Sequence, residues 1–471
     1  MRGATRGVPE DGKERGGIGD AGQHGGGGRA RDAGRGRRGE RPVRRRFLLA
    51  FLAVLAAPLF GQDTQQDKEE KDPDEKASRR FVWKKHPSVR LGKWLRVDFR
   101  ARYQGDWTIY DPEVKGTPEL YNTERKRFAV EGTFLRHIEY EISREFAETD
   151  FPWKDVYGNL RYFRSFQVRG GRFRIPFSMD QLTGPTNLDF VERSRIADLL
   201  APNRDTGVML HGPVGERGGV KYQFGYFFND GDNAADRNNR RTGENTWAGR
   251  VTGRPLEFLM ADPWIFDNLT VGAAYNTSQV DEGLFSLRGR TVSAETFFPY
   301  FFVNGRRERF GTEFEWLPGP FSLKSEYISV REEREGQGLT GQNLPDLISR
   351  GFYVSGTWVP TGQAKAKSLA KGRRVPFISR KAWGAIELAT RYEYIRFGSD
   401  GGTGRPSRST RASNVLGNSN RAWTFGVNWY LNQWTKMQAN FVHERLEDPF
   451  RSPIQGQRNF WSYKFRLQLA L

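Results

Sequence analysis

Basic side chains recur at two- or four-residue spacing in five short segments of the chain. The five pairs are Arg100 and Arg102, Arg125 and Arg127, Arg172 and Arg174, Arg250 and Arg254, and Lys464 and Arg466. On a β-strand, this spacing places both members of a pair on the same face. A guanidinium group stays charged at every physiological pH and offers forked N–H donors that match oxyanions. The pairs therefore predict strand faces that guide or bind small anions.

The segments that carry these pairs alternate between apolar and polar residues. Segment 459–471, NFWSYKFRLQLAL, has Trp, Tyr, Phe and Leu at every second position and mostly polar or basic residues between them. A period of two indicates a β-strand with one apolar face. The same pattern recurs from residue 95 onward. We predict sixteen strands, at 95–107, 124–134, 139–147, 155–163, 167–175, 205–213, 220–228, 245–253, 268–278, 308–317, 321–331, 351–360, 383–397, 421–431, 434–446 and 458–471.

Long and short connections alternate between these strands. The connections after odd-numbered strands are mostly long, and those after even-numbered strands are mostly short, with 254–267 and 361–382 as exceptions. A transmembrane β-barrel with long extracellular loops and short periplasmic turns has this arrangement. We therefore predict an all-β fold, a transmembrane antiparallel barrel of about sixteen strands. Its last strand is expected to pair with its first, so that no open edge remains.

A secreted β-sandwich is the main alternative, because its strands also alternate. Sandwich cores favour Val, Ile and Leu, whereas the apolar faces here are rich in Trp, Tyr and Phe near strand ends, as in the aromatic girdles of barrels. The mean hydropathy of −0.72 and the apolar content of 37% also suit a barrel, in which only alternate residues face lipid. Beyond the N-terminal region no segment is apolar enough for a membrane helix.

The N-terminal region divides into three segments before the predicted barrel at 95–471. Residues 1–43 are rich in Gly and Arg, and we interpret them either as an extension upstream of a start at Val43 or as a basic arm. Residues 44–61, RRRFLLAFLAVLAAPLFG, have the charged and apolar regions of a signal peptide, with cleavage expected near Gly61. Residues 62–94 are expected to form a charged periplasmic linker.

Several classes of function are disfavoured by composition. The net charge is +19, of which +7 lies in residues 1–61, but an exported chain is not expected to meet nucleic acid. The chain has no Cys, and its five His are scattered without metal-ligand spacing, so no metal or cofactor is expected. No His lies in a pattern that suggests a catalytic nucleophile with its base. We therefore expect a protein that is not an enzyme, with an adhesin or scaffold barrel as a further alternative.

If the aromatic faces contact lipid, the basic faces line the lumen and form an anion path. Phe173 and Ile175 are then expected to point outward. The predicted lining residues are Arg100, Arg102, Arg125, Arg127, Arg172, Arg174, Arg193, Arg204, Arg250, Lys464 and Arg466. Rings of Arg and Lys favour anions. Glutamates on the same inward faces would partly screen them: Glu139, Glu141, Glu145, Glu313, Glu315, Glu326, Glu387 and Glu393.

The loop 176–204 is expected to fold into the lumen and narrow it, because a long loop without its own strand pattern is usually functional. A second loop, NDGDNAADRNNR at 229–240, contains Asp230, Asp232, Asn233 and Asp236 and partly matches a calcium loop. It lacks the Glu that a calcium loop has at its twelfth position. We therefore expect a polar surface loop there.

The loop 176–204 and its flanks resemble the phosphate-selective porin O and P family. The resemblance rests on GRFRIPFSMDQLT, LDFVERS, LAPNRDTGVMLHG, GYFFNDGD, WAGRVTGRP and later segments such as FGTEFEWLPGPFSLKSEYI, in order over residues 90–471. It implies a homotrimeric porin in the outer membrane of a Gram-negative bacterium that passes phosphate or polyphosphate. It also implies constriction roles for Arg172, Arg174, Arg193 and Arg204, with Asp189 nearby.

Two features depart from the family pattern. The family has a lysine cluster at its central site, but the loop 176–204 has no Lys, and the chain ends in Leu471 where the family has Phe or Trp. The leading hypothesis is passive diffusion of small anions through an arginine-lined lumen. The alternative is a general, weakly selective porin for small hydrophilic solutes. An outer-membrane enzyme would need a catalytic constellation that the sequence does not suggest.

Overall fold

The computed structural model describes residues 80–83, 86–111, 121–215, 219–235, 240–256, 268–292, 294–367, 384–454 and 456–471. The N-terminal extension 1–43 and the signal peptide predicted at 44–61 lie outside these residues. In the part of the chain that is described, no helix is both long and apolar enough to cross a bilayer.

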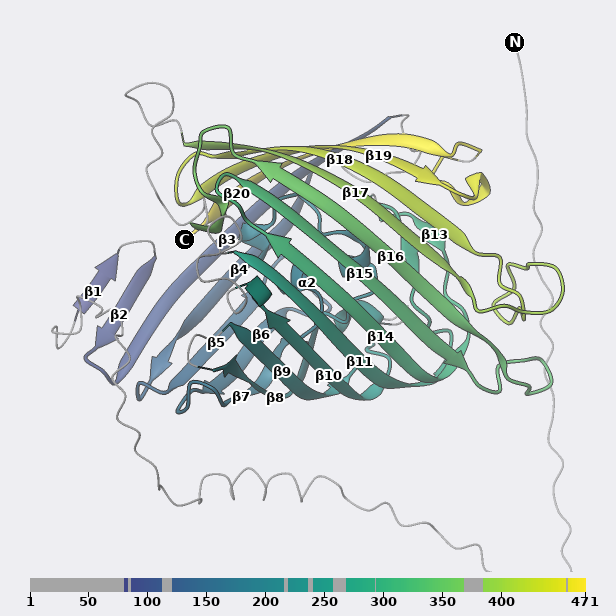
Figure 1. Cartoon of the computed structure of the whole chain (residues 1–471), viewed down its shortest axis with the longest axis horizontal. Coiled ribbons are helices and arrows are strands. Elements are labelled where there is room, and N and C mark those ends of the chain that lie inside the picture. Colours follow the sequence, from purple (N-terminus) through teal and green to yellow (C-terminus); the bar gives the residue numbers. More distant parts are fainter. Residues whose placement is uncertain are drawn as a thin grey trace, which may run out of the picture. The chain divides into compact units, whose positions relative to one another are not determined.

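Sixteen antiparallel strands of the described chain form a closed barrel (Figure 1). Each strand pairs with the next, and the last pairs with the first, from Trp461 opposite Asp111 to Ala470 opposite Arg102. The barrel fold and its predicted closure are confirmed. The wall strands are β3 (Leu95–Asp111), β4 (Tyr121–Phe134), β5 (Ile138–Glu145), β6 (Trp153–Leu160), β7 (Gln167–Arg174), β8 (Arg204–Val214), β9 (Val220–Asn229), β10 (Glu244–Gly253), β11 (Leu269–Gly283), β14 (Val303–Trp316), β15 (Phe321–Arg334), β16 (Leu344–Trp358), β17 (Ala385–Ser399), β18 (Asn418–Tyr430), β19 (Thr435–Leu446) and β20 (Asn459–Ala470).

The outer face of the wall is apolar and the inner face is polar. In β20 the side chains of Trp461, Phe465 and Leu469 are exposed, whereas Lys464 and Arg466 between them are buried in the barrel. Lipid accepts apolar side chains at no cost, while charged groups need polar partners that only the interior offers. In β20 the alternation of residue types along the sequence therefore predicts correctly which side chains face outward and which face the lumen.

Strand β7 is the exception to the predicted register. Phe173 and Ile175 were expected to face lipid, but their exposed fractions are 1% and 0%. The ring of Phe173 packs inside the barrel, with its centroid 5.3 Å from that of Phe227 and 6.2 Å from that of Tyr157. The reason is the pairing of β7 with β6, which turns the odd-numbered residues inward: Gln167 accepts a hydrogen bond from the inward-facing Asn159 at 3.1 Å. Arg172 and Arg174 occupy the alternate positions of β7, but neither points to lipid: the Arg172 side chain is only 10% exposed, and Arg174 donates to the backbone carbonyl of Thr183 in the loop.

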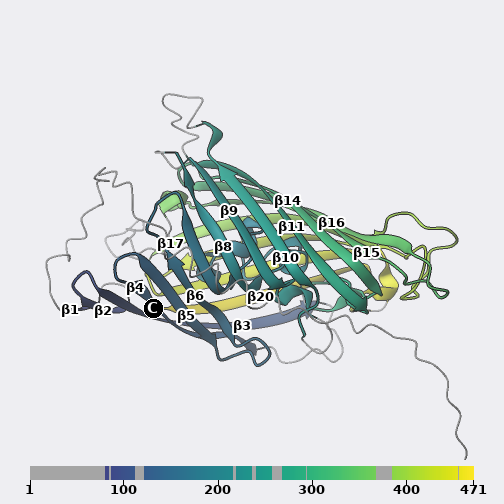
Figure 2. The same ribbon diagram turned by 90° about the horizontal axis from the view of Figure 1, so that it is seen from below.

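Two further strands precede the barrel. Residues in the segment 62–94, which the sequence analysis assigns to a linker, form β1 (Arg80–Trp83) and β2 (Pro87–Leu91). These strands pair with each other, and β2 also pairs with the beginning of β3. Figure 2 shows this hairpin beside the start of β3, at the end of the barrel where the C-terminus lies. The strands are short and flanked by charges, so their sequence resembles a linker.

The loop between β7 and β8 lies against the inner wall, as expected. It contains α2 (Met179–Leu182), the 3-10 turn η1 (Pro185–Asn187) and α3 (Arg195–Leu199). Its apolar side chains lie over wall glycines, where there is no side chain to obstruct them. A Cβ atom added to Gly311 would lie 3.1 Å from Phe177, and one added to Gly351 would lie 2.7 Å from Ile196.

A second loop, between β11 and β14, also packs inside the barrel, which the sequence analysis does not predict. It contains β12 (Gly289–Arg290) and β13 (Thr296–Phe298). The rings of Phe297 and Phe298 lie with their centroids 5.8 Å and 5.1 Å from that of Phe397 on the inner wall. Burial of these aromatic rings supplies much of the loop's stability. At least two of the long loops therefore pack inside the barrel, and loop length alone did not predict that this one would.

Candidate functional site

The loop between β7 and β8 is held to the wall by glutamates that face inward. Glu326 on β15 accepts hydrogen bonds from the backbone N–H groups of Met179 at 2.6 Å and Asp180 at 3.0 Å. Glu393 on β17 accepts one from the backbone N–H of Arg195 at 2.6 Å. Both carboxylates therefore bind the free N–H groups at the start of a short helix, where a negative charge is stabilised.

The second loop is held in the same way. Glu332 on β15 accepts a hydrogen bond from the backbone N–H of Leu287 at 3.1 Å, and Glu444 on β19 accepts one from that of Val292 at 3.1 Å. Of the eight glutamates that were expected to screen the arginines, Glu326 and Glu393 act as loop anchors, whereas Glu145 and Glu313 pair with Arg127 and Arg250. The anchoring role matters for selectivity, because a carboxylate engaged by backbone N–H groups is less available to neutralise a guanidinium across the lumen.

Three of the predicted lining residues face inward but are held in ion pairs. Each is bound by one carboxylate within 3.0 Å: Arg250 by Glu313 at 2.6 Å, Lys464 by Glu192 at 3.0 Å and Arg466 by Asp106 at 2.6 Å. Lys464 and Arg466 also donate to the backbone carbonyls of Val292 and Val191 in the two loops. These three side chains brace the wall and the loops, and their charges are largely compensated.

Seven other predicted residues form what we call the guanidinium cluster. They come from β3, β4, β7, β8 and the loop: Arg100, Arg102, Arg125, Arg127, Arg174, Arg193 and Arg204. The charges that act most strongly on Arg102 are those of Arg127, Arg125, Arg100 and Arg204, all of them positive. Arg193 on the loop is likewise influenced by Arg125 and Arg204. The structure therefore brings together side chains that the sequence spreads over about a hundred residues.

Most members of the guanidinium cluster have a protein partner. Arg100, Arg127 and Arg204 are paired with carboxylates, while Arg174 and Arg193 donate to the backbone carbonyl of Thr183 at 3.0 Å and 2.6 Å. The three carboxylate pairs are Arg100 with Glu131 at 2.9 Å, Arg127 with Glu145 at 3.2 Å and Arg204 with Asp155 at 2.8 Å, and Arg125 donates to Gln104 at 2.7 Å.

Arg102 has two buried nitrogen atoms, Nε and Nη1, without an acceptor among the described residues, whereas Arg174 of the same cluster has one, its Nε. A buried N–H group without an acceptor is costly. An anion that stops beside Arg102 would supply the missing acceptor and would also be attracted by the surrounding positive charges. Arg102 is therefore the member of the guanidinium cluster with the most buried N–H groups that lack an acceptor among the described residues.

Arg172 does not join the guanidinium cluster. Its Nη2 atom binds Asp232 at 2.7 Å and its Nε donates to the backbone carbonyl of Trp153 at 2.7 Å. Asp232 lies in η2 (Asp232–Ala234), just after β9, and it also binds Arg241 at 3.0 Å. The implied constriction role of Arg172 is therefore not supported by its contacts, because its guanidinium binds Asp232 in η2 and the backbone of Trp153, the first residue of β6.

The partial calcium motif is accounted for by the same kind of contact. Asp230 is fully buried and binds Arg307 at 2.5 Å and Arg309 at 2.8 Å. With Asp232 held by two arginines, both carboxylates have guanidinium partners where a calcium site would need free oxygens. Asp236 lies outside the described residues. Among the described residues, no group of three or more His, Cys, Asp or Glu is arranged to hold a metal ion.

A cluster of lysines surrounds Asp189 on the loop. Lys324 binds this carboxylate at 2.9 Å and Lys365 binds it at 2.5 Å. Lys436 lies close by and donates to the backbone carbonyl of Leu188 at 2.6 Å. Burial alone would raise the pKa of the Asp189 carboxyl, but the ammonium groups of Lys324 and Lys365 hold that pKa well below its ordinary value. Asp189 therefore stays negatively charged.

The sequence analysis missed this lysine cluster because its members do not come from the loop. Lys324 and Lys436 occupy inward positions near the beginnings of β15 and β19. Lys365 belongs to η4 (Lys365–Lys367), in the connection after β16. That connection is one of the two that broke the predicted alternation of long and short. Its unusual length was the available signal that it does more than turn the chain.

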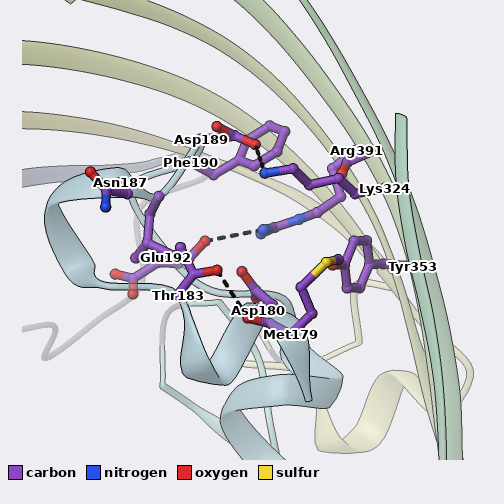
Figure 3. Close-up of a pocket in the computed structure, with 12 residues that line it drawn as sticks. Met179, Asp180, Thr183, Asn187, Asp189, Phe190, Glu192, Lys324, Tyr353 and Arg391 are labelled. Carbon is purple, nitrogen blue, oxygen red and sulfur yellow. Dashed lines mark hydrogen bonds and ion pairs between the residues drawn. The ribbon is translucent and has the colours of Figure 1, made fainter. Parts of the chain in front are cut away.

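A small pocket separates the loop from the wall beside the lysine cluster (Figure 3). Asp189 and Phe190 extend from the loop toward Lys324 and Arg391 on the wall. The guanidinium of Arg391 lies 4.4 Å from the ring centroid of Phe190 and donates to the backbone carbonyl of Glu192 at 3.1 Å. The loop is therefore fixed in position by charge contacts at the same place where its lysine-bound carboxylate lies.

A closed sixteen-stranded barrel with an apolar outer face and loops packed inside it defines an outer-membrane channel protein. Residues 97–469 match the model of the family described as phosphate-selective porin O and P. The chain belongs to this family, and its place is the outer membrane.

Comparison with individual proteins gives more distant similarity. Porin O of Pseudomonas aeruginosa is 26% identical over 139 residues, which is 29% of this chain and 30% of that protein. The match thus spans about a third of the relative's length. Outer-membrane expressed OmpT of Vibrio cholerae is similar in fold, with 12% identity, a TM-score of 0.50 and coverage of 83% of this chain and 100% of that one. The outer membrane channel DcaP of Acinetobacter baumannii has a TM-score of 0.47, at 9% identity, over 80% of this chain and 97% of that one.

Proposed function

We propose that the protein is a passive, anion-selective porin for phosphate and polyphosphate-type small anions. The anions pass the guanidinium cluster, beside the loop between β7 and β8. Arg102 carries the proposal: it is surrounded by like charges, and its buried Nε and Nη1 have no acceptor among the described residues. A tetrahedral oxyanion has enough acceptor oxygens to bind several guanidinium groups at once. Diffusion down a gradient requires no cofactor and no catalytic group.

The lysine cluster supports an oxyanion as the solute. Lys324, Lys365 and Lys436 converge at the loop, where Asp189 accepts from Lys324 and Lys365, and Glu387 accepts from Lys365. These two carboxylates compensate most of the charge of Lys324 and Lys365. A compensated cluster binds an anion weakly enough to release it, and weak binding is required for conduction. A permeating anion then binds briefly at the guanidinium cluster and at the lysine cluster in turn. Membership of the porin O and P family further supports a homotrimer, and the sequence of residues 44–61 supports export by a cleaved signal peptide.

A general, weakly selective porin is the second candidate. The ion pairs of Arg250, Lys464 and Arg466 favour it, because they leave the lumen closer to neutral than the number of basic residues suggests. In that case the glutamates cancel the arginines, and small hydrophilic solutes pass according to size. The two candidates differ in whether an oxyanion competes with chloride inside the channel.

The test is block of the chloride current by added phosphate in a planar bilayer that contains the purified mature protein. The proposed function predicts that phosphate lowers the single-channel chloride conductance with saturation, because phosphate occupies a site that chloride must cross. An equal concentration of a neutral sugar of similar size serves as the control and should leave the conductance unchanged. Equal effects of phosphate and sugar would instead support the general porin.

A further inference from the structure

The hairpin of β1 and β2 completes the wall of the barrel at its first strand. β20 ends at Ala470, opposite Arg102, and the backbone N–H of Leu471 donates to the carbonyl of Ala101 at 2.9 Å. The beginning of β3 therefore lacks a β20 partner. β2 takes this place, with Ser88 opposite Asp98. An exposed strand edge would leave backbone groups without partners, which lipid does not tolerate.

The hairpin continues both faces of the wall. Phe81, Val89 and Val97 lie in register across β1, β2 and β3, on the side of β3 that faces outward. On the other face, the Ser88 hydroxyl donates to Asp98 at 2.5 Å. Because the outward face of the wall contacts lipid, the aromatic face of the hairpin is continuous with the lipid-facing surface.

Two aromatic side chains of β1 lie on this outward face, and a third lies in the adjoining turn. The exposed fractions are 62% for Phe81 and 59% for Trp83, and Trp94 in the turn between β2 and β3 is exposed at 69%. The carbonyl of Trp94 accepts from the backbone N–H of Leu135, in the short turn between β4 and β5. Short turns of such barrels lie on the periplasmic side. Trp94 therefore lies at the periplasmic rim, and the hairpin that carries Phe81 and Trp83 adjoins it.

We propose that the β1–β2 hairpin and Trp94 anchor the protein in the periplasmic leaflet of the outer membrane. Phe81, Trp83 and Trp94 insert among the lipid headgroups, while the polar face with Ser88 turns toward the periplasm. Aromatic side chains are enriched at membrane interfaces because an amphipathic ring suits that environment. The continuity of the sheet favours lipid as the occupant of this face over a second copy of the chain. The anchor goes beyond the proposed transport function and depends only on the outer-membrane location.

The absence of cysteine from the chain allows a direct test with single-cysteine variants of the full protein. Trp83→Cys places a label on the aromatic face, and Val82→Cys places one on the opposite face of the same strand. Each variant is labelled with an environment-sensitive fluorophore and reconstituted into phosphatidylethanolamine and phosphatidylglycerol vesicles. We expect lipids with a spin label at the headgroup to quench the Trp83→Cys label several-fold more than the Val82→Cys label. Iodide on both sides of the membrane should show the reverse order.

Two results would overturn the anchor. If iodide quenches both labels equally, the hairpin extends into water. If the Trp83→Cys label is shielded from iodide and from lipid, and two copies of that variant form a disulfide, a second copy covers the face. Phe81→Cys lies on the same face and repeats the measurement if Trp83→Cys does not fold. None of these variants touches the guanidinium cluster, so phosphate block of the chloride current is expected to stay unchanged and reports separately on the proposed function.

Discussion

Replacing Arg102 by Gln is expected to weaken phosphate block of the chloride current by roughly 10- to 100-fold. A hydrogen bond to a charged group contributes about 1.5–3 kcal/mol, and a tenfold change in affinity corresponds to about 1.4 kcal/mol. Arg102→Gln removes the guanidinium whose Nε and Nη1 have no acceptor among the described residues, and it leaves the ion pairs of the neighbouring arginines in place. The measurement is the phosphate concentration that halves the single-channel chloride conductance.

Arg100→Gln is the matched control for this prediction. Arg100 lies on the same strand, two residues away, but its side chain is 48% exposed and already paired with Glu131. Its loss should change the half-blocking phosphate concentration much less than the loss of Arg102. Equal effects of the two variants would show that the total positive charge of the wall matters and that the missing acceptor at Arg102 does not.

The double variant Glu326→Ala and Glu393→Ala is expected to release the loop between β7 and β8 and to raise the single-channel conductance. The two carboxylates accept three backbone N–H groups at the beginnings of α2 and α3. A hydrogen bond contributes about 0.5–1.5 kcal/mol, so the loss of three weakens the anchoring of the loop by roughly 2–4 kcal/mol. A loop that leaves the wall also opens the lumen beside Asp189. Conductance in the bilayer and protease cleavage within 175–203 measure the release.

Glu139→Ala provides the comparison. Glu139 also faces inward, but its contacts are to Asn159 and Arg161, on β6 and just beyond it. The Glu139→Ala substitution removes an inward negative charge without affecting any contact of the loop. The conductance and protease resistance of this variant should therefore match those of the unmodified protein. If the double variant behaves like Glu139→Ala, the apolar contacts of Phe177 and Ile196 with the wall hold the loop by themselves, and the anchoring role of the glutamates is refuted.

Much of the barrel could be predicted because its strands obey a simple physical rule. Lipid on one side and polar groups on the other impose a period of two, and the predicted strand ends lie within five residues of the observed ones, except that β16 begins at Leu344, seven residues before the predicted start at 351. The predicted direction of the side chains was wrong in β7, because the residue types on both faces of this strand could point either to lipid or to the lumen. In GRFRIPF, arginines alternate with apolar residues, and only pairing with β6 decides that Phe173 points inward.

The candidate site was predicted less completely, because its contacts depend on where the loops lie. The inward direction of Glu326 and Glu393 follows from their spacing, but their role as loop anchors requires the position of α2 and α3. Lys365 belongs to a connection without periodicity, so no pattern could direct it to Asp189. Arg102 was named among eleven candidates, and what sets it apart is the lack of an acceptor for its buried Nε and Nη1 among the described residues, which no sequence pattern could indicate.

The zero-current potential of the purified mature protein in a planar bilayer, under a KCl gradient, tests the central claim most directly. With the guanidinium cluster lining the path, chloride should cross much more readily than potassium, and the potential should approach the value for chloride alone. A potential near zero, or one of the opposite sign, would contradict the claim. It would mean that the inward carboxylates neutralise the arginines, and that the channel admits solutes without regard to negative charge.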